Sequence, residues 1–166
     1  MRVKILCLAA AALLLAACET TPTGTGSTGG TGAGTGTGTA TQTRTGPVPG
    51  SQEDLVVNVG DRVFFDFDKY DVKPAGQQVL QKQAAWLKTY PNVTLTVEGH
   101  CDERGTREYN LALGERRATA VKNYLVALGI NANRVRTISY GKERPAVLGS
   151  NEAAWSQNRR GVSVVN

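Results

Sequence analysis

The feature that most limits what this chain can fold into is a tract of Thr and Gly near its start. Residues 20–50 contain twelve Thr and ten Gly, together with three Pro and a single charged side chain, Arg44. Such a tract cannot bury a core, so it is predicted to be a disordered tether with a mean span of roughly 30 Å. A spacer that carries sugars on its threonines is the alternative. Residues 51–166 remain as one domain with one core.

The first twenty residues predict the compartment. Arg2 and Lys4 stand at the start of an apolar run, residues 3–17, that is too short to span a bilayer and is typical of a secretory signal. The run ends in LAAC at positions 15–18, which resembles the bacterial lipobox, where the cysteine is acylated and the chain is cut just before it. Residues 1–17 are thus the expected signal peptide and residues 18–50 the acylated Cys18 plus tether. An ordinary signal peptide with an incidental cysteine is the alternative. Glu19, in place of the Asp that favours inner-membrane retention, favours the outer membrane.

Apolar spacings predict the elements of the domain. Strands are expected at residues 55–59, 62–67, 93–98, 136–140 and 162–165, and helices at residues 74–90, 106–128 and 152–158. Pro74 suits the first turn of the first long helix, and Gly129 suits the end of the second. The pattern predicts an α+β fold: a two-layer α/β sandwich with a βαβαβ core, a mixed sheet and both long helices on one face.

Residues 97–118, VEGHCDERGTREYNLALGERRA, place a strand end, a charged turn and an amphipathic helix within 22 residues. Asp102 is at the strand exit. On the helix, Asn110, Leu113 and Arg117 follow spacings of three and four beside the stripe that faces the core, so they share one face. Two interpretations are open: a ligand-binding face, or a structural salt bridge between Asp102 and Arg117.

These residues resemble a known family. GHCDERG followed by YNLALGERRA is similar to the peptidoglycan-binding domain shared by outer-membrane protein A C-termini and motility-motor stators, and most similar to the peptidoglycan-associated lipoproteins, or Pal family. VFFDFDKYDV from Val63, ISYGKERPAVLG from Ile138 and EAAWSQNRRGVSVV from Glu152 extend the resemblance over residues 54–166.

The resemblance implies a non-enzymatic outer-membrane lipoprotein that binds the diaminopimelate of uncrosslinked peptidoglycan stems. Asp102 would accept the ligand's ammonium and Arg117 would bind its carboxylate, which suits a carboxylate and a planar guanidinium fork. Asp68 and Phe67 would line the pocket from the turn after the second strand, and Leu113 and Asn110 would complete it from the helix. The family also implies a role in the Tol system through the periplasmic protein TolB, with envelope integrity and constriction at division as its purpose.

Other functions find little support in the sequence. His100 is the only histidine, so neither a multi-histidine metal site nor a cofactor is expected, and no nucleophile elbow or P-loop is present. Without Arg2 and Lys4 the net charge is only +3, so nucleic acid is a poor partner. Cys101 departs from the Thr or Ala usual in the family; it is expected to be a small buried residue, with His100 on the opposite sheet face. In the pairs Arg116-Arg117 and Arg159-Arg160, one member of each is expected to be solvated.

Two further function classes stay open. One is a wall-binding lipoprotein with a different partner, such as a motility or secretion accessory. The other, less supported, is a periplasmic hydrolase acting on the wall. The identity of co-purifying proteins separates the first from a Tol-system protein.

Overall fold

The computed structural model describes residues 46–166. The expected signal peptide, Cys18 and the tether up to residue 45 lie outside the described residues. The elements in chain order are α1 (Gln52–Asp54), the π-helical turn η1 (Leu55–Val59), β1 (Arg62–Phe64), α2 (Pro74–Thr89), β2 (Leu95–His100), α3 (Arg107–Ala127), the 3₁₀ turn η2 (Ala132–Arg134), β3 (Val135–Gly141), α4 (Glu152–Asn158) and β4 (Arg160–Val165).

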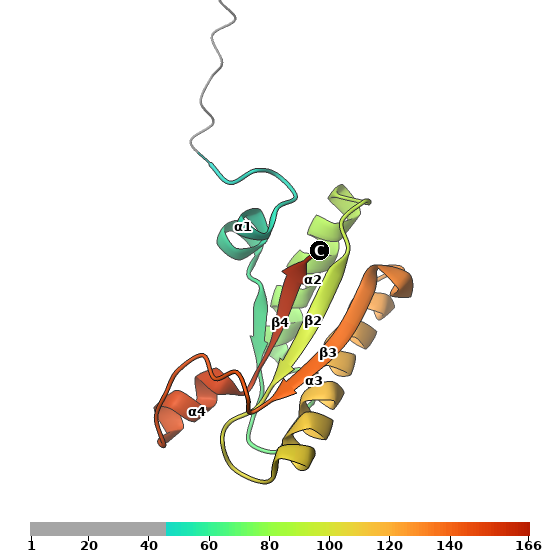
Figure 1. Ribbon diagram of the computed structural model, residues 1–166. Coiled ribbons are helices and arrows are strands. Elements are labelled where there is room, and N and C mark those ends of the chain that lie inside the picture. The colour runs from blue at the N-terminus through green and yellow to red at the C-terminus, as the bar shows by residue number, and fades with distance from the viewer. Residues whose placement is uncertain (1–45) are drawn as a thin grey trace, which may run out of the picture. The chain divides into compact units, whose positions relative to one another are not determined.

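The four strands form one mixed sheet in the order β1-β4-β2-β3. β4 runs antiparallel to both of its neighbours, and β2 pairs with β3 in parallel through the crossover helix α3. Figure 1 shows α2 and α3 side by side on one face of this sheet. The predicted α+β fold, a two-layer sandwich with both long helices on one face, is confirmed. The core lies between the layers and is built from side chains such as Leu80, Leu87, Leu95, Val97 and Leu125, none of which has exposed surface.

Two glycines let helix α3 approach the sheet closely. A Cβ atom on Gly99 of β2 would lie 1.8 Å from the main-chain oxygen of Gly114 in α3, so only glycine fits there. A Cβ atom on Gly114 would in turn lie 2.3 Å from Oγ of Ser139. This contact places the first half of α3, which carries Asn110, Leu113 and Arg117, directly over the end of β2.

The strand expected at residues 55–59 is wrong, because this segment is helical. The Ser51 hydroxyl accepts the main-chain N–H of Asp54 at 3.2 Å and caps the turn. The Asp54 carboxylate accepts hydrogen bonds from the Gly50 main chain at 2.8 Å, the Asn58 amide at 2.7 Å and the Trp86 indole at 2.9 Å. These contacts lower the pKa of Asp54, that of Asn58 most, and fix the turn.

The second strand is shorter than predicted. β1 ends at Phe64 rather than residue 67, although the Phe65 N–H still donates to the Arg159 carbonyl at 2.9 Å. The chain then turns, with the Lys69 N–H on the Asp66 carbonyl at 3.2 Å. Asp68, inside this turn, has φ of +57°, a left-handed conformation that few residues other than Gly adopt. The turn therefore holds Phe67 and Asp68 beyond the end of β1.

The remaining predicted elements are observed within a few residues of their expected ends. α3 begins after Thr106, whose hydroxyl accepts the Tyr109 N–H, and it ends before Gly129, which has φ of +91°. α4 spans the expected residues 152–158. No helix among residues 46–166 is long and apolar enough to cross a membrane.

Candidate ligand-binding pocket

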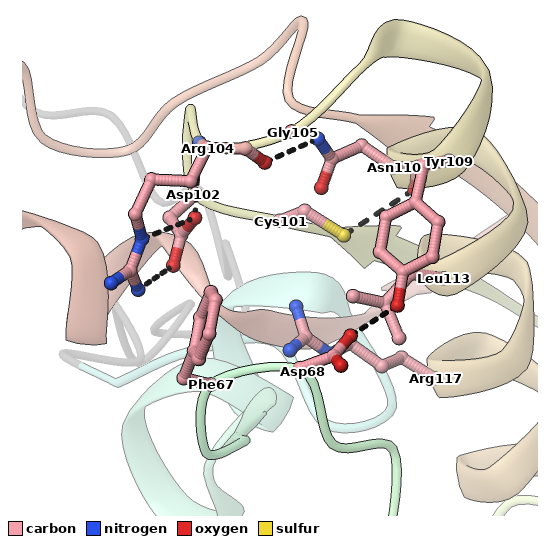
Figure 2. A pocket seen from close by; sticks show the side chains of 10 residues that line it. All are labelled: Phe67, Asp68, Cys101, Asp102, Arg104, Gly105, Tyr109, Asn110, Leu113 and Arg117. Carbon is pink, nitrogen blue, oxygen red and sulfur yellow. Dashed lines mark hydrogen bonds and ion pairs between the residues drawn. The ribbon is translucent and has the colours of Figure 1, made fainter.

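A cavity of about 170 Å³ opens at the end of β2, between the turn after β1, the loop after β2 and the first turns of α3 (Figure 2). All six predicted ligand residues line it, which brings together residues up to fifty positions apart. The lining residues are Phe67, Asp68, Cys101, Asp102, Arg104, Gly105, Tyr109, Asn110, Leu113 and Arg117. The cavity is smaller than the pockets that enclose drug-sized molecules, and its size suits the end group of one amino acid.

Arg117 brings a buried cation to the floor of this cavity. Its side chain has no exposed surface, and its guanidinium donates to three main-chain carbonyls: Asp66 at 3.0 Å, Lys69 at 2.8 Å and His100 at 2.9 Å. The Phe65 ring lies 5.2 Å below the guanidinium. Burial lowers the pKa of Arg117, against the opposing effects of nearby groups. These three hydrogen bonds use three of its five N–H groups.

Asp102 supplies a buried negative charge to the cavity and is 4 % exposed. Its carboxylate accepts hydrogen bonds from Arg104 at 2.5 to 3.2 Å and from Arg159 at 3.3 Å. Burial raises the pKa of Asp102, but the hydrogen bonds from the two arginines outweigh it and hold the pKa below its ordinary value. Arg159 is itself fixed by the Phe65 carbonyl at 3.0 Å and by Glu152 at 2.5 Å.

The structural salt bridge between Asp102 and Arg117 is not observed. Asp102 pairs with Arg104 and Arg159, and no carboxylate among residues 46–166 lies within 4.0 Å of the Arg117 nitrogens. The physical reason is local. Arg104 is two residues from Asp102 and pairs with it, while Arg117 is held by carbonyls of the turn after β1 and of the end of β2. The two predicted charges therefore stand in one cavity with separate partners.

Asn110 and Leu113 act as parts of the cavity wall. The Asn110 amide donates to the carbonyls of Arg104 at 2.7 Å and Thr106 at 2.9 Å, which closes the loop after β2 onto α3. Leu113, 6 % exposed, forms the apolar side of the wall. The predicted amide is thus used first to hold the loop that carries Asp102 (Figure 2).

The rim of the cavity is aromatic. Phe67 is 57 % exposed and Tyr109 is 48 % exposed, and the Tyr109 hydroxyl donates to the Asp68 carboxylate across the cavity mouth. This hydrogen bond raises the pKa of Tyr109. It joins the turn after β1 to α3 on one side of the opening (Figure 2).

Two arginines that bind Asp102 were not predicted from the sequence: Arg104, and Arg159 directly after α4. The expectation of one solvated member in each arginine pair holds for Arg116 but is wrong for the second pair, because Arg159 and Arg160 are both buried, at 5 % and 7 % exposure. Arg160 donates to main-chain carbonyls of Asn158 and Arg144. The one usable signal for Arg159 was Glu152, seven residues earlier on a predicted short helix and of opposite charge.

Cys101 and His100 point to different sides of the sheet, as expected. The Cys101 thiol is buried, as expected, and donates to the Asn110 carbonyl at 3.4 Å; burial raises its pKa to about 11, which favours the neutral thiol. His100 is 1 % exposed, next to Glu98 at 3.3 Å and with its ring centroid 5.6 Å from that of Tyr140. No group of three potential metal ligands occurs in the described chain.

We expect His100 to make the domain less stable in mild acid. Burial, with help from Arg160 and Arg144, lowers its pKa from 6.5 to about 4. Between these values the unfolded chain binds a proton that the folded chain does not, so the free energy of unfolding falls as pH drops, by roughly 1 kcal/mol per pH unit. Urea unfolding between pH 7 and pH 5 measures this slope. The His100→Gln variant should show a clearly smaller slope, and an equal slope in both proteins would contradict the assignment.

The cavity lies in a part of the chain that matches a known protein family. A model of the OmpA family matches residues 64–159, which is more than half of the chain and includes every residue of the cavity. The chain belongs to the OmpA family. The resemblance stated from the sequence motifs is thereby confirmed.

Several curated relatives of the chain are named peptidoglycan-associated lipoprotein, and two of them show the degree of similarity. The protein from Agrobacterium fabrum is 58 % identical over 117 residues, which are 70 % of this chain and 66 % of the relative. The protein from Brucella melitensis is 57 % identical over 118 residues, 71 % of this chain and 70 % of the relative. The crystal structure of the peptidoglycan-associated lipoprotein from Burkholderia pseudomallei matches with a TM-score of 0.64 and 42 % identity, over 68 % of this chain and all of that one.

Proposed function

We propose that this chain is a non-enzymatic lipoprotein of the outer membrane that binds peptidoglycan through the diaminopimelate of its stem peptides. Its relatives' name and the OmpA family model support peptidoglycan as the ligand. In this proposal Arg117 binds the carboxylate at the free end of diaminopimelate and Asp102 binds the neighbouring ammonium. Phe67, Asp68, Asn110 and Leu113 enclose the end group.

The observation that carries this proposal is the buried guanidinium of Arg117. A cation without exposed surface and without a carboxylate within 4.0 Å among residues 46–166 is costly to bury, and Arg117 lines an open cavity. A bound carboxylate supplies the missing negative charge. An acidic group in the same cavity then selects a ligand that also carries an ammonium, which describes a zwitterionic amino-acid end.

The position of the pocket suits a tether. The described chain begins at Gly46 near α1, and β1 runs from that end of the sheet to the turn that lines the cavity, so the cavity lies at the opposite end (Figure 1). An acylated Cys18 would hold one end of the chain at the membrane. About 32 residues of extended tether reach on the order of 105 Å, enough to bring the cavity to a separate layer.

Co-sedimentation with purified sacculi tests the proposed binding, and mass spectrometry of proteins retained with the chain tests its partners. We expect the wild-type protein to pellet with sacculi and to retain Tol proteins. Retention of motility or secretion components without Tol proteins would favour the second candidate instead.

We predict that replacing Cys18 by Ser releases the protein from the membrane. The variant lacks the thiol that receives the lipid, so it should remain uncleaved or appear in the soluble periplasm. Cell fractionation with mass measurement of the purified chain checks this. A Cys18→Ser protein that is still cleaved before position 18 and still fractionates with the outer membrane would contradict lipid anchoring at this residue.

We further propose that TolB binds on the cavity side, over the turn after β1 and residues 102–108. This surface carries exposed aromatic side chains, Phe67, Tyr70 and Tyr109, of the kind that anchor protein interfaces. Such an interface would cover the cavity mouth, so TolB and wall fragments should compete. A binding assay with both partners should show that saturating muropeptide weakens TolB binding. Independent binding of the two would contradict a shared surface.

A further inference from the structure

Every hydrogen-bond acceptor site of Asp102 is already occupied. Oδ1 accepts the main-chain N–H and the side-chain Nε of Arg104, both at 3.2 Å. Oδ2 accepts Nη2 of Arg104 at 2.5 Å and Nη1 of Arg159 at 3.3 Å. An ionised carboxylate offers about four such sites. A ligand ammonium therefore cannot bind Asp102 unless one of these donors leaves.

Arg104 is the donor that can leave. Its side chain is 31 % exposed, whereas that of Arg159 is 7 % exposed and is fixed by the Phe65 carbonyl and by Glu152. The Arg104 guanidinium lies between two aromatic rings, 4.0 Å from the centroid of Phe67 and 4.1 Å from that of Trp155. Two cation–π contacts and the Asp102 carboxylate hold the guanidinium in place, and Figure 2 shows it beside Asp102 and Phe67.

We propose that Arg104 is a latch that occupies Asp102 in the free pocket and is displaced by the ligand's ammonium. The proposal rests on the proposed function, because it concerns the same end group in the same cavity. The guanidinium occupies the carboxylate oxygens that the ammonium would bind, and the aromatic pair keeps it there until a cation replaces it. Once released, Arg104 remains close to acidic Glu103 and Glu152, whose charges already act on it.

The latch adds selectivity to the pocket. An ammonium can replace a guanidinium on a carboxylate, but the neutral amide that forms when the same amino group is cross-linked brings no charge to the exchange. The pocket should therefore discriminate against cross-linked stems more strongly than one with a vacant Asp102. Arg104 is in this sense a specificity-determining residue.

Isothermal titration of the full-length protein in detergent with the tripeptide L-alanyl-γ-D-glutamyl-meso-diaminopimelate tests the latch. The Arg104→Ala variant should bind the tripeptide about three- to tenfold more tightly than the wild type, since an ion pair and stacking no longer compete with the ammonium. Arg136→Ala is the control. It removes one exposed arginine of β3 that does not line the cavity, and its affinity should stay within about twofold of the wild type.

Trp155 reports the movement itself. The chain has two tryptophans. Trp86 is 8 % exposed and donates a hydrogen bond to Asp54, and it does not line the pocket. Ligand binding should change the fluorescence of Trp155 in the wild type, because the guanidinium leaves its ring. The change should be absent in Arg104→Ala, although that variant binds, and absent in Trp155→Phe.

The outcomes separate the latch from the proposed function. Wild-type binding with equal or weaker binding by Arg104→Ala, or with an unchanged Trp155 signal, overturns the latch and leaves the proposed function standing. Binding by Arg104→Ala alone supports a latch that is tighter than expected. Failure of the wild type and of Arg104→Ala to bind the tripeptide overturns the proposed ligand and the latch together.

Discussion

Replacing Arg117 by Ala is expected to abolish wall binding and to lower the free energy of unfolding by about 4 kcal/mol or more. The side chain has no exposed surface, and its loss leaves three carbonyls, of Asp66, Lys69 and His100, without their charged donor. These carbonyls belong to the turn after β1 and to the end of β2, which both border the cavity, so binding and stability should fall together. Urea unfolding measures the second effect and co-sedimentation with sacculi the first.

Arg117→Lys separates the two roles. Lysine keeps the charge but cannot donate to three carbonyls and a carboxylate from one planar fork, so it should recover part of the stability and little of the binding. Arg116→Lys, one position earlier on the exposed face of α3, is the matched control and should match the wild type. Wild-type protein should bind a ligand with an amidated diaminopimelate carboxylate as poorly as Arg117→Ala binds the unmodified ligand. A folded Arg117→Lys protein that binds sacculi like the wild type would contradict the assignment.

Replacing Asp102 by Asn should reduce affinity for the wall ligand by about 2 to 5 kcal/mol, which is roughly 30-fold or more. The amide keeps the shape of the side chain but removes the charge that binds the ammonium. Stability should fall less, by about 1 to 3 kcal/mol, because Arg159 keeps Glu152 as a carboxylate partner. Titration with the stem tripeptide, together with urea unfolding, gives both values.

Asp71→Asn is the control for Asp102→Asn. It makes the same chemical change at an exposed position in the segment after β1, outside the residues that line the cavity. We expect it to leave both affinity and stability unchanged within about 0.5 kcal/mol. Equal losses in the two variants would show that general electrostatics, and not a contact with Asp102, controls binding.

The helices, and the shared face of Asn110, Leu113 and Arg117 on α3, followed well from the sequence because both depend on regular spacing. Thr106 and Gly129 mark the ends of α3, and the helical repeat brings Asn110, Leu113 and Arg117 to one cavity. The alternation of residues 93–98 likewise located β2 to within two residues. These features need only local geometry, which the sequence contains.

The strand predicted at residues 55–59 failed because a side-chain cap outweighs β-propensity there. LVVNV alternates weakly and is rich in valine, but Ser51 and Asp54 form a cap before it, and Asp54 is then fixed by Trp86 from the distant helix α2. The Ser-x-x-Asp spacing was a usable local signal. The hydrogen bond between Asp54 and Trp86, which are 32 positions apart, could not be predicted from residue spacing.

The charge pairs of the cavity were the least predictable part. The spacing placed Asp102 and Arg117 near each other but did not reveal that Arg104 and Arg159 take the carboxylate. Which arginine pairs with a carboxylate depends on loop geometry and on α4, which packs against the loop from the far end of the chain. Side-chain direction in loops does not follow a sequence period.

One titration tests directly whether Arg117 binds a ligand carboxylate. The wild-type protein is titrated with two tripeptides that differ by a single group: one ends in meso-diaminopimelate, the other in L-lysine, which has the ammonium but lacks the neighbouring carboxylate. We predict measurable binding of the diaminopimelate peptide and a loss of about 2 kcal/mol or more with the lysine peptide, because the buried guanidinium then has no anion to bind. Equal affinities for the two peptides would contradict a contact between Arg117 and the ligand carboxylate.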